Sequence, residues 1–347
     1  MKRFQISNLR FLFIIPPPSS FNSRLLPCGT VAYNSAFLNS PLSLAVSRMV
    51  YLKQQRPEKV TVPTFRASKE RGERLVCLTA YDYPTARIID EAGVDLILVG
   101  DSLGNVVLGY DSTVPVTIDE MVMHTRAVRR GVERALLVAD MPYGSYHTGA
   151  DDAVRAALRL IKEGGAEAVK LEGGRVRAPL VKRLVEEEVP VMGHIGLTPQ
   201  SLHKLGGYRL QGKTADAART LVEDAHALEA AGAFAIVLEV VPREIAEMIT
   251  ESVHVPTIGI GAGEGCDAQI LVVHDLVGLS FSRTRPRFVR QYANLRETMT
   301  DAISRYAEDV RSGTYPSANE SYPLPADAAA DLNDAPIGGN DTEVERP

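Results

Sequence analysis

KEGGAEAVKLEGG, residues 162–174, passes from the end of a helix-forming segment through a pair of glycines into a short apolar run. The same order of residues recurs in DEAGVDLILVG (90–100) and in EAAGAFAIVLEVVP (229–242). In each stretch a glycine supplies the left-handed residue that ends a helix. The run that follows is continuously apolar, as in strands buried on both faces of a parallel sheet. The repeated unit therefore predicts alternating helices and parallel strands.

Eight such apolar runs follow one another along the chain. They are RLVCLTAYD (74–82), VDLILVGDS (94–102), ALLVADMP (135–142), EAVKLEGG (167–174), VPVMGHIGL (189–197), FAIVLEVVP (234–242), VPTIGIGAG (255–263) and LVVHDLVGL (271–279). Amphipathic segments accompany them and are predicted as helices over 84–92, 118–130, 150–163, 176–187, 215–231, 243–250 and 288–312. Eight βα units in a block of about 255 residues match an α/β fold, the (β/α)8 TIM barrel. An open, doubly wound parallel sheet is the alternative that the pattern leaves open.

Composition divides the 347 residues into one central block and two tails. Residues 58–316 have the hydrophobicity of one compact domain, without a Ser/Gly/Pro linker, and are predicted to form the catalytic barrel. Residues 317–347 carry seven acidic residues and hardly any large apolar ones, which predicts a disordered tail. Residues 1–57 form an N-terminal extension whose first 48 residues hold five basic groups and no Asp or Glu. Two interpretations stay open: a transit peptide, or a wrongly assigned extension of a protein that starts at Met49.

Charge and cysteine content narrow the class of protein. A formal net charge of −5 offers no basic field for nucleic acid. The longest early apolar run, FLFII (11–15), is far shorter than the roughly 18 residues of a spanning helix. Cys28, Cys77 and Cys266 form no CxxC pair, which argues against a disulfide framework and favours a reducing compartment. We therefore expect a cytoplasmic protein without nucleic-acid or membrane partners, or a mitochondrial one if residues 1–48 are a transit peptide.

Polar residues end the eight apolar runs, where the active site of such a barrel lies. They are Tyr81 and Asp82, Asp101 and Ser102, Asp140, Lys170 and Glu172, His194, Glu239, and His274 and Asp275. Carboxylates that lie beside apolar residues must meet cations or one another, because an unpaired buried charge is costly. Asp101, Asp140 and Glu172 end consecutive runs, and their hard oxygens favour Mg²⁺ over zinc. An ordinary helix N-cap or loop salt bridge is the structural alternative for each carboxylate.

Three further strand-end residues suggest roles in catalysis. Lys170 and Glu172 are two positions apart and therefore share one face of their strand, so an ammonium should lie beside the presumed metal site. Glu239 lies among apolar residues, where desolvation should raise its pKa toward that of a general base. His194 is a candidate donor to a substrate oxygen. The structural alternatives are a simple Lys–carboxylate pair, a buried Glu paired with a cation, and a satisfied loop histidine. GIGAG (259–263) lacks the spacing of a dinucleotide fingerprint.

The sequence resembles the ketopantoate hydroxymethyltransferase family over about residues 58–316. The strings that carry the resemblance are LTAYDYPTA (78–86), VGDSLGNVVLGY (99–110), VPVTIDEMVMHTRAVRRG (114–131), ADMPYGSY (139–146), VKLEGG (169–174), GHIGLTPQS (193–201), GGYRLQGKT (206–214), LEVVP (238–242) and IGIGAG (258–263). Tyr143 stands where the family pattern leads us to expect Phe, and both tails exceed the usual family length. The family is placed among the (β/α)8 barrels of the phosphoenolpyruvate/isocitrate-lyase type.

The resemblance implies a reaction of 3-methyl-2-oxobutanoate with 5,10-methylenetetrahydrofolate and water, which gives 2-dehydropantoate and tetrahydrofolate in pantothenate biosynthesis. By the same resemblance, Asp101 and Asp140 would hold Mg²⁺, with Glu172 in the metal shell directly or through water. The ketoacid would contact a second set of residues: Asp101, Ser102, Asp140, Lys170 and, in a supporting place, His194. Glu239 would remove the C3 proton to give a Mg²⁺-stabilised enolate. A homo-oligomer, a decamer of two pentameric rings, is implied as well.

Two other functions compete with this interpretation. A carbon–carbon lyase or mutase of the same barrel group would also use a Mg²⁺-bound enolate, but the sequence has no KKCGH-type motif and Cys266 lies in a different context. A non-catalytic ketoacid- or folate-binding protein would be expected to lack at least one of the four strand-end carboxylates. All four are present: Asp101, Asp140, Glu172 and Glu239.

Overall fold

The computed structural model describes residues 58–281, 285–325 and 328. The chain divides into two units, Met1–Arg48 and Met49–Pro347, of which the first lies wholly outside the described residues. The predicted N-terminal extension, 1–57, therefore lies outside them too. None of the described helices is long and apolar enough to cross a bilayer.

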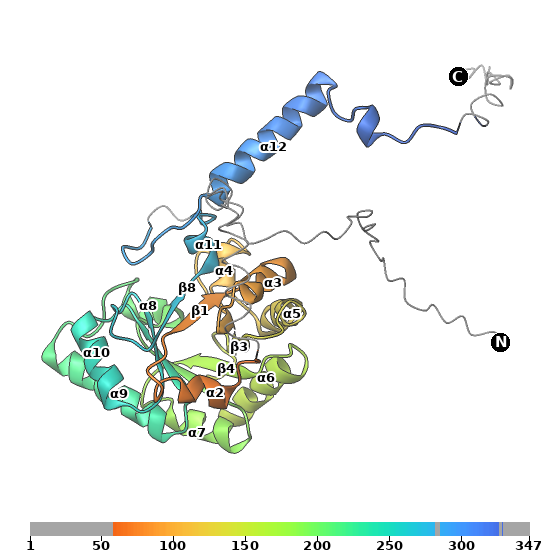
Figure 1. Cartoon of the computed structure of the whole chain (residues 1–347). Coiled ribbons are helices and arrows are strands. Elements are labelled where there is room, and N and C mark those ends of the chain that lie inside the picture. The colour runs from red at the N-terminus through yellow and green to blue at the C-terminus, as the bar shows by residue number, and fades with distance from the viewer. Residues whose placement is uncertain (1–57, 282–284, 326–327, 329–347) are drawn as a thin grey trace, which may run out of the picture. The chain divides into compact units, whose positions relative to one another are not determined.

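Eight parallel strands close into one barrel in the order of the sequence (Figure 1). The strands are β1 Leu75–Thr79, β2 Leu96–Val99, β3 Leu136–Asp140, β4 Ala168–Glu172, β5 Val191–Gly196, β6 Ala235–Glu239, β7 Thr257–Ile260 and β8 Ala268–Leu271. The first strand pairs with the last, with Leu75 opposite Ala268. The TIM barrel is thus confirmed, and the open doubly wound sheet is excluded because such a sheet has two free edges.

Helices follow most of the strands (Figure 1). They are α2 Val62–Ala67, α3 Tyr83–Glu91, α4 Leu103–Val106, α5 Ile118–Arg129, α6 Ala150–Lys162, α7 Ala178–Glu186, α8 Leu202–Leu205, α9 Ala215–Ala230, α10 Arg243–Ser252, α11 Val273–Leu276 and α12 Leu295–Ser312, with 3₁₀ turns η1 Pro199–Ser201 and η2 Ala318–Glu320. The six predicted helices between residues 84 and 250 match α3, α5, α6, α7, α9 and α10 within a few residues.

Two apolar cores hold the barrel together. The larger one lies between the outer faces of the strands and the helices, and it joins residues such as Ile97 and Val169 to Ile89 and Leu160. The smaller one fills the barrel and consists almost entirely of strand residues that point inward. Its exceptions are Phe234, which directly precedes β6, and Phe65 of α2, which is fully buried with its ring edge against Phe234 at 6.1 Å between centroids. The helix α2 therefore closes the amino end of the barrel.

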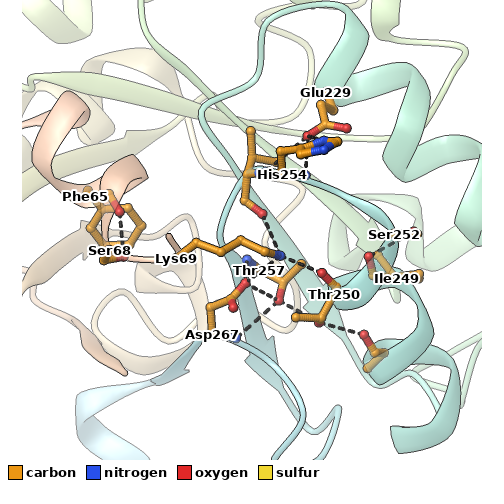
Figure 2. Close-up of polar contacts among 12 residues, drawn as sticks. Phe65, Ser68, Lys69, Glu229, Ile249, Thr250, Ser252, His254, Thr257 and Asp267 are labelled. Atoms are coloured by element: carbon orange, nitrogen blue, oxygen red, sulfur yellow. Dashed lines mark hydrogen bonds and ion pairs between the residues drawn. The ribbon is translucent and has the colours of Figure 1, made fainter. Parts of the chain in front are cut away.

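A network of polar side chains lies beside α2 at this amino end, and we call Lys69, Thr250, Thr257 and Asp267 the amino-end network (Figure 2). The Lys69 ammonium lies 3.1 Å from Asp267 Oδ2 and donates to the carbonyl oxygens of Thr250 and Val255 at 2.5 and 3.3 Å. The Asp267 carboxylate also accepts from Thr257 N at 2.8 Å. Each charge in the network thus has an opposite charge and additional hydrogen-bond partners.

The predicted position of the eighth strand is wrong. The run 271–279 was expected to form it, but β8 is Ala268–Leu271, and the run shares only Leu271 with β8 and contains the short helix α11. Asp267 fixes the start of β8, because its carboxylate binds Thr257 N across the β7–β8 pair. The strand itself carries Gln269, which is exposed, so its sequence is less apolar than the run after it.

The predicted start of the closing helix is also wrong, because α12 begins at Leu295 and not at residue 288. The backbone just before α12 is held by the end of α11 instead of by helical hydrogen bonds. Tyr292 N donates to Leu276 O, and Leu295 N donates to Val277 O. Of the predicted acidic tail, 317–347, the structure describes 317–325 and 328, where η2 is closed by a capping box between Ser317 and Glu320. The rest of that tail lies outside the described residues.

Candidate active site

The strand-end residues of β2 to β6 gather at the carboxyl end of the barrel because the register places them side by side. Asp140 lies opposite Lys170, and Glu172 lies opposite His194. Glu239 lies opposite Gly196, the last residue of β5. We call Asp101, Asp140, Lys170, Glu172, His194 and Glu239 the carboxylate cluster. All of them are buried except Glu239, whose side chain is 17% exposed.

Asp101, Asp140 and Lys170 form one half of this cluster. Asp140 Oδ2 accepts a hydrogen bond from Asp101 N at 3.0 Å, and the Lys170 ammonium lies 2.9 Å from Asp140 Oδ1. Burial raises the pKa of Asp101 well above its usual range, and the charges of Asp140 and Glu172 raise it further. Burial lowers the pKa of Lys170, but the surrounding carboxylates outweigh this effect and raise it overall, so Lys170 is a cation at neutral pH.

His194 joins this half of the cluster to Glu239. Its Nδ1 lies 3.3 Å from Lys170 Nζ and 3.5 Å from Glu172 Oε1, and its Nε2 lies 3.2 Å from Glu239 Oε2. The contact with Glu239 has the length of an ion pair, although its angle is poor for a hydrogen bond. Burial and Lys170 lower the pKa of His194, but Glu172 and Glu239 outweigh them and raise it to about 9. The imidazole therefore lies between two carboxylates that favour its cationic form.

The backbone that carries Glu239 is tightly constrained. Gly196 has φ of 92°, and a Cβ on it would lie 2.3 Å from Glu239 O, so only glycine fits there. Val240 has φ of 49°, which is rare and strained for a β-branched residue. Its N–H donates to Ile260 O at 2.9 Å, so the strained turn is tied to β7. This turn fixes where β6 ends and where the Glu239 side chain begins.

The other strand-end candidates have different environments. Ser102 Oγ lies 2.8 Å from the hydroxyl of the buried Tyr81, next to Asp101 in the chain. Asp82 caps α3 by accepting from Thr85 N at 2.8 Å, which is the structural alternative foreseen for such residues. His274 lies in α11 with its ring 5.4 Å from the Tyr81 ring. No described contact joins His274 or Asp275 to the carboxylate cluster.

Two neutral residues that the sequence did not single out as candidates belong to this site. Gln200, in η1, is buried and donates from Nε2 to Asp101 Oδ2 at 2.8 Å and from its backbone N to Glu172 Oε2 at 3.0 Å. The buried Tyr146 donates its hydroxyl proton to Gln200 Oε1. Neither side chain carries a charge at neutral pH, so a search for charged strand ends passes over them. Their place in the loops after β3 and β5 is the signal that could have found them.

The cluster has the properties of a divalent-cation site, although no group of three His, Cys, Asp or Glu among the described residues is gathered closely enough to hold an ion alone. The cluster contains four carboxylates but only two basic side chains, Lys170 and His194. In addition, Asp140 Oδ1 is buried and receives no well-directed hydrogen bond. Mg²⁺ prefers hard oxygen ligands and commonly uses one or two carboxylates together with water and substrate. Asp101, Asp140 and Glu172 supply oxygens of this kind, and water or substrate would have to complete the coordination of such an ion.

Comparisons with known proteins match most of the chain. The model of the family described as "Ketopantoate hydroxymethyltransferase" matches residues 59–318. A relative from Koribacter versatilis named 3-methyl-2-oxobutanoate hydroxymethyltransferase is 57% identical over 274 residues, which cover 79% of this chain and 92% of the relative. A relative of the same name from Moorella thermoacetica is 56% identical, with 76% and 98% covered.

Solved structures with a similar fold are more distant in sequence. One is 2,3-dimethylmalate lyase, a PEP mutase/isocitrate lyase superfamily member, with a TM-score of 0.49, 16% identity, and 78% of this chain and 97% of that chain covered. Another is phosphonopyruvate hydrolase in complex with oxalate and Mg²⁺, with a TM-score of 0.48, 15% identity, and 75% and 92% covered.

Proposed function

The chain belongs to the ketopantoate hydroxymethyltransferase family, and from this premise we propose that it transfers a hydroxymethyl group from 5,10-methylenetetrahydrofolate to 3-methyl-2-oxobutanoate, giving 2-dehydropantoate. The observation that carries the proposal is the arrangement of the carboxylate cluster. Glu239 is the least buried carboxylate of the cluster. His194 lies between it and the other half of the cluster, which contains Lys170 and Asp140. A carboxylate that can act as a base and a buried ammonium group are thus separated by a single imidazole.

This arrangement suits the removal of a proton from the carbon next to a carbonyl group. In the proposed reaction, a Glu239 oxygen accepts the C3 proton of the ketoacid, and the electron pair moves to the 2-oxo oxygen to give an enolate. The Lys170 ammonium lies where it can stabilise that negative charge, because a preorganised cation in a buried site acts strongly on developing charge. The enolate carbon then forms the new bond to the one-carbon unit of the folate, and water supplies the hydroxyl group. Both carbon–nitrogen bonds of that unit break, and the C3 proton and the second proton of the water end on the two folate nitrogens, so tetrahydrofolate is the leaving group.

The buried carboxylates Asp101, Asp140 and Glu172 are the residues that would hold Mg²⁺. When bound, this ion supplies Lewis-acid stabilisation of negative charge on the ketoacid oxygens. Asp101 and Asp140 are joined to each other through the hydrogen bond from Asp101 N, which keeps their carboxylates together. Glu172 is engaged on both sides, by Gln200 N and by His194, and this position favours a contact through water over a direct one. Ser102 would contact the ketoacid from beside Asp101.

The first experiment is deuterium exchange at C3 of 3-methyl-2-oxobutanoate, followed by NMR with and without Mg²⁺. It compares the full chain with Glu239→Gln and with the control Glu251→Gln, which changes an exposed carboxylate on α10. We expect Mg²⁺-dependent exchange that the control retains and that Glu239→Gln loses by about 10² to 10⁴-fold. A folded protein that binds Mg²⁺ and the ketoacid but catalyses no exchange would instead be a binding protein. Exchange that survives in Glu239→Gln would remove Glu239 from its proposed role.

The protein is also proposed to be a homo-oligomer, as the decamers implied by the family resemblance are. Helix α12 supports this, since it has no buried residue. Its apolar side chains are exposed and recur every three or four positions, so they share one face: Leu295, Met299, Ile303, Tyr306 and Val310. A second copy of the chain would cover such a face. Size-exclusion chromatography with light scattering measures the mass of the assembly.

A cytoplasmic location is proposed as well. The two cysteines among the described residues, Cys77 and Cys266, are free and buried, in keeping with a reducing compartment. The relatives named above are bacterial, which favours the cytoplasm over the mitochondrial alternative.

A further inference from the structure

We infer that Gln200, held in place by Tyr146, is a positioning residue that orients the cation-binding carboxylates of this site. The inference rests on the proposed function, because it assumes that Asp101 and Glu172 bind a divalent cation. Gln200 is 5% exposed and makes contacts to both carboxylates, from its side chain to Asp101 and from its backbone to Glu172. One residue therefore ties together the ends of β2 and β4, which are not neighbours in the barrel.

The hydrogen bonds to the three cation-binding carboxylates follow one pattern. In each carboxylate, one oxygen is held by a neutral N–H group. Asp101 Oδ2 accepts from Gln200 Nε2, Asp140 Oδ2 from Asp101 N, and Glu172 Oε2 from Gln200 N. The other oxygen of Asp140 lies toward Lys170 and that of Glu172 toward His194, while Asp101 Oδ1 accepts no hydrogen bond from the described residues. Neutral donors thus set the orientation of each carboxylate without cancelling its charge.

The orientation of the Gln200 amide is itself determined by its partners. Its Nε2 faces Asp101 Oδ2 and, at 3.0 Å, Met141 O, and both of these atoms are acceptors. Its Oε1 faces the Tyr146 hydroxyl, which donates to it. A flipped amide would place its oxygen against two acceptors, so the assignment of oxygen and nitrogen follows from the contacts. Tyr146 in turn is 3% exposed, with the Arg177 guanidinium 5.1 Å above its ring.

Removing the amide of Gln200 frees Asp101 but leaves the backbone contact to Glu172 in place. The expected consequence is a weaker cation site with an otherwise intact barrel, because the groups that orient metal ligands affect affinity by about 10- to 100-fold. Removing only the Tyr146 hydroxyl leaves the amide present but free to turn, so its effect should be smaller. In the double variant the two losses should not multiply, since the Tyr146 hydroxyl acts on Asp101 through Gln200. Its other contact, a 3.4 Å hydrogen bond from Glu172 N, is to the backbone and not to a carboxylate oxygen.

The test is a calorimetric titration of the full chain with Mn²⁺ alone, in the absence of substrate. The variants are Gln200→Met, which keeps the size of the side chain, Tyr146→Phe and the double variant. Tyr143→Phe is the matched control, because Tyr143 lies in the same loop but is 46% exposed and its hydroxyl makes no hydrogen bond with a described residue. Circular dichroism and thermal unfolding establish that each variant is folded. The KM and kcat of C3 exchange are then measured as a function of Mg²⁺.

We expect Mn²⁺ affinity to fall at least about tenfold in Gln200→Met, less in Tyr146→Phe, and no further in the double variant. The control should bind as the unaltered chain does, and saturating Mg²⁺ should restore much of the exchange. Unchanged Mn²⁺ affinity in folded Gln200→Met and Tyr146→Phe would overturn the inference. Should Gln200→Met fail to fold, the Mn²⁺ affinity of Tyr146→Phe decides the question by itself. If the unaltered chain binds Mn²⁺ and catalyses exchange, only the inference has failed; if it does neither, the proposed function has failed first.

Discussion

Both ends of the barrel pair a lysine with an aspartate, partly buried at the amino end and buried at the carboxyl end, and surround the pair differently. At the amino end, Lys69 and Asp267 are each 17% exposed, and their pairing is completed by Thr257 and by backbone carbonyls (Figure 2). At the carboxyl end, Lys170 and Asp140 are 6% and 4% exposed, but they stand among further carboxylates. The pair at the amino end is balanced, whereas the cluster at the carboxyl end has an excess of negative charge.

The balance of charge distinguishes a structural group of charged side chains from a functional one better than the degree of burial does. A balanced, hydrogen-bonded pair holds elements together, and its removal leaves an unpaired charge. In an unbalanced cluster the excess carboxylates repel one another, which costs stability, and such clusters occur mainly at functional sites. The same substitution at the two ends should therefore change stability in opposite directions.

The largest effect is expected at the carboxyl end, for Asp101→Asn. Loss of one cation ligand should lower C3 exchange by about 10³-fold, or about 4 kcal/mol of transition-state stabilisation. In the presence of a chelator the same change should leave the midpoint of thermal unfolding unchanged or raise it, because it removes one of several like charges. Exchange assays and calorimetry measure the two quantities. A variant that is clearly destabilised without metal would show that the cluster is balanced after all.

The matched change at the amino end, Asp267→Asn, should have the opposite effect. It leaves the Lys69 ammonium without its carboxylate in a partly buried place, and we expect a loss of about 2 kcal/mol in the free energy of unfolding. The kcat of the folded enzyme should stay within about twofold of the original, since the network lies at the far end of the strands. Urea denaturation gives the first value and steady-state kinetics the second. A large fall in kcat would contradict the division between the two ends.

The smallest effect is expected from the two non-glycine residues that have positive φ in the described part of the chain, Val240 at the carboxyl end and Glu188 at the amino end. Replacing either by Gly relieves strain of about 1 kcal/mol, partly offset by the flexibility of Gly in the unfolded chain. Stability should therefore change by less than about 1 kcal/mol in both variants. Only Val240→Gly should lower kcat, by about tenfold, because Glu239 is then held less firmly. Equal kcat values for the two variants would show that the strained turn does not position Glu239.

Most of the fold could be predicted from the sequence because strands buried on both faces have a clear pattern. The strands β1 to β7 lie within the predicted runs, and the residues that end β2 to β6 are brought together as expected. The pattern was misleading at β8, where the more apolar run contains α11 and the true strand starts at Ala268, directly after Asp267. A contact between distant parts of the chain, here with Thr257 and Lys69, decided this boundary.

The candidate site could be predicted less completely than the strands. Charged residues such as Asp140 and Lys170 stand out because their burial needs an explanation. They form an ion pair, which the sequence analysis named as the structural alternative for Lys170. Gln200 and Tyr146 are neutral residues in loops, where polar side chains are ordinary, and only the three-dimensional contacts give them a role. The strain at Val240 had no counterpart in the sequence analysis either, since valine commonly occurs in and beside strands.

The closing of the barrel also bears on how the chain folds during synthesis. Strand β1 pairs with β8, and Lys69 binds Asp267, which lies 198 positions further along the chain. Contacts between such distant residues form slowly, because a long loop must close before they contribute. During synthesis on the ribosome, one edge of β1 therefore stays unpaired until nearly the whole barrel has been translated. This topology favours a folding route in which strands add to the sheet in chain order from β1, and in which pairing of β8 with β1 closes the barrel last.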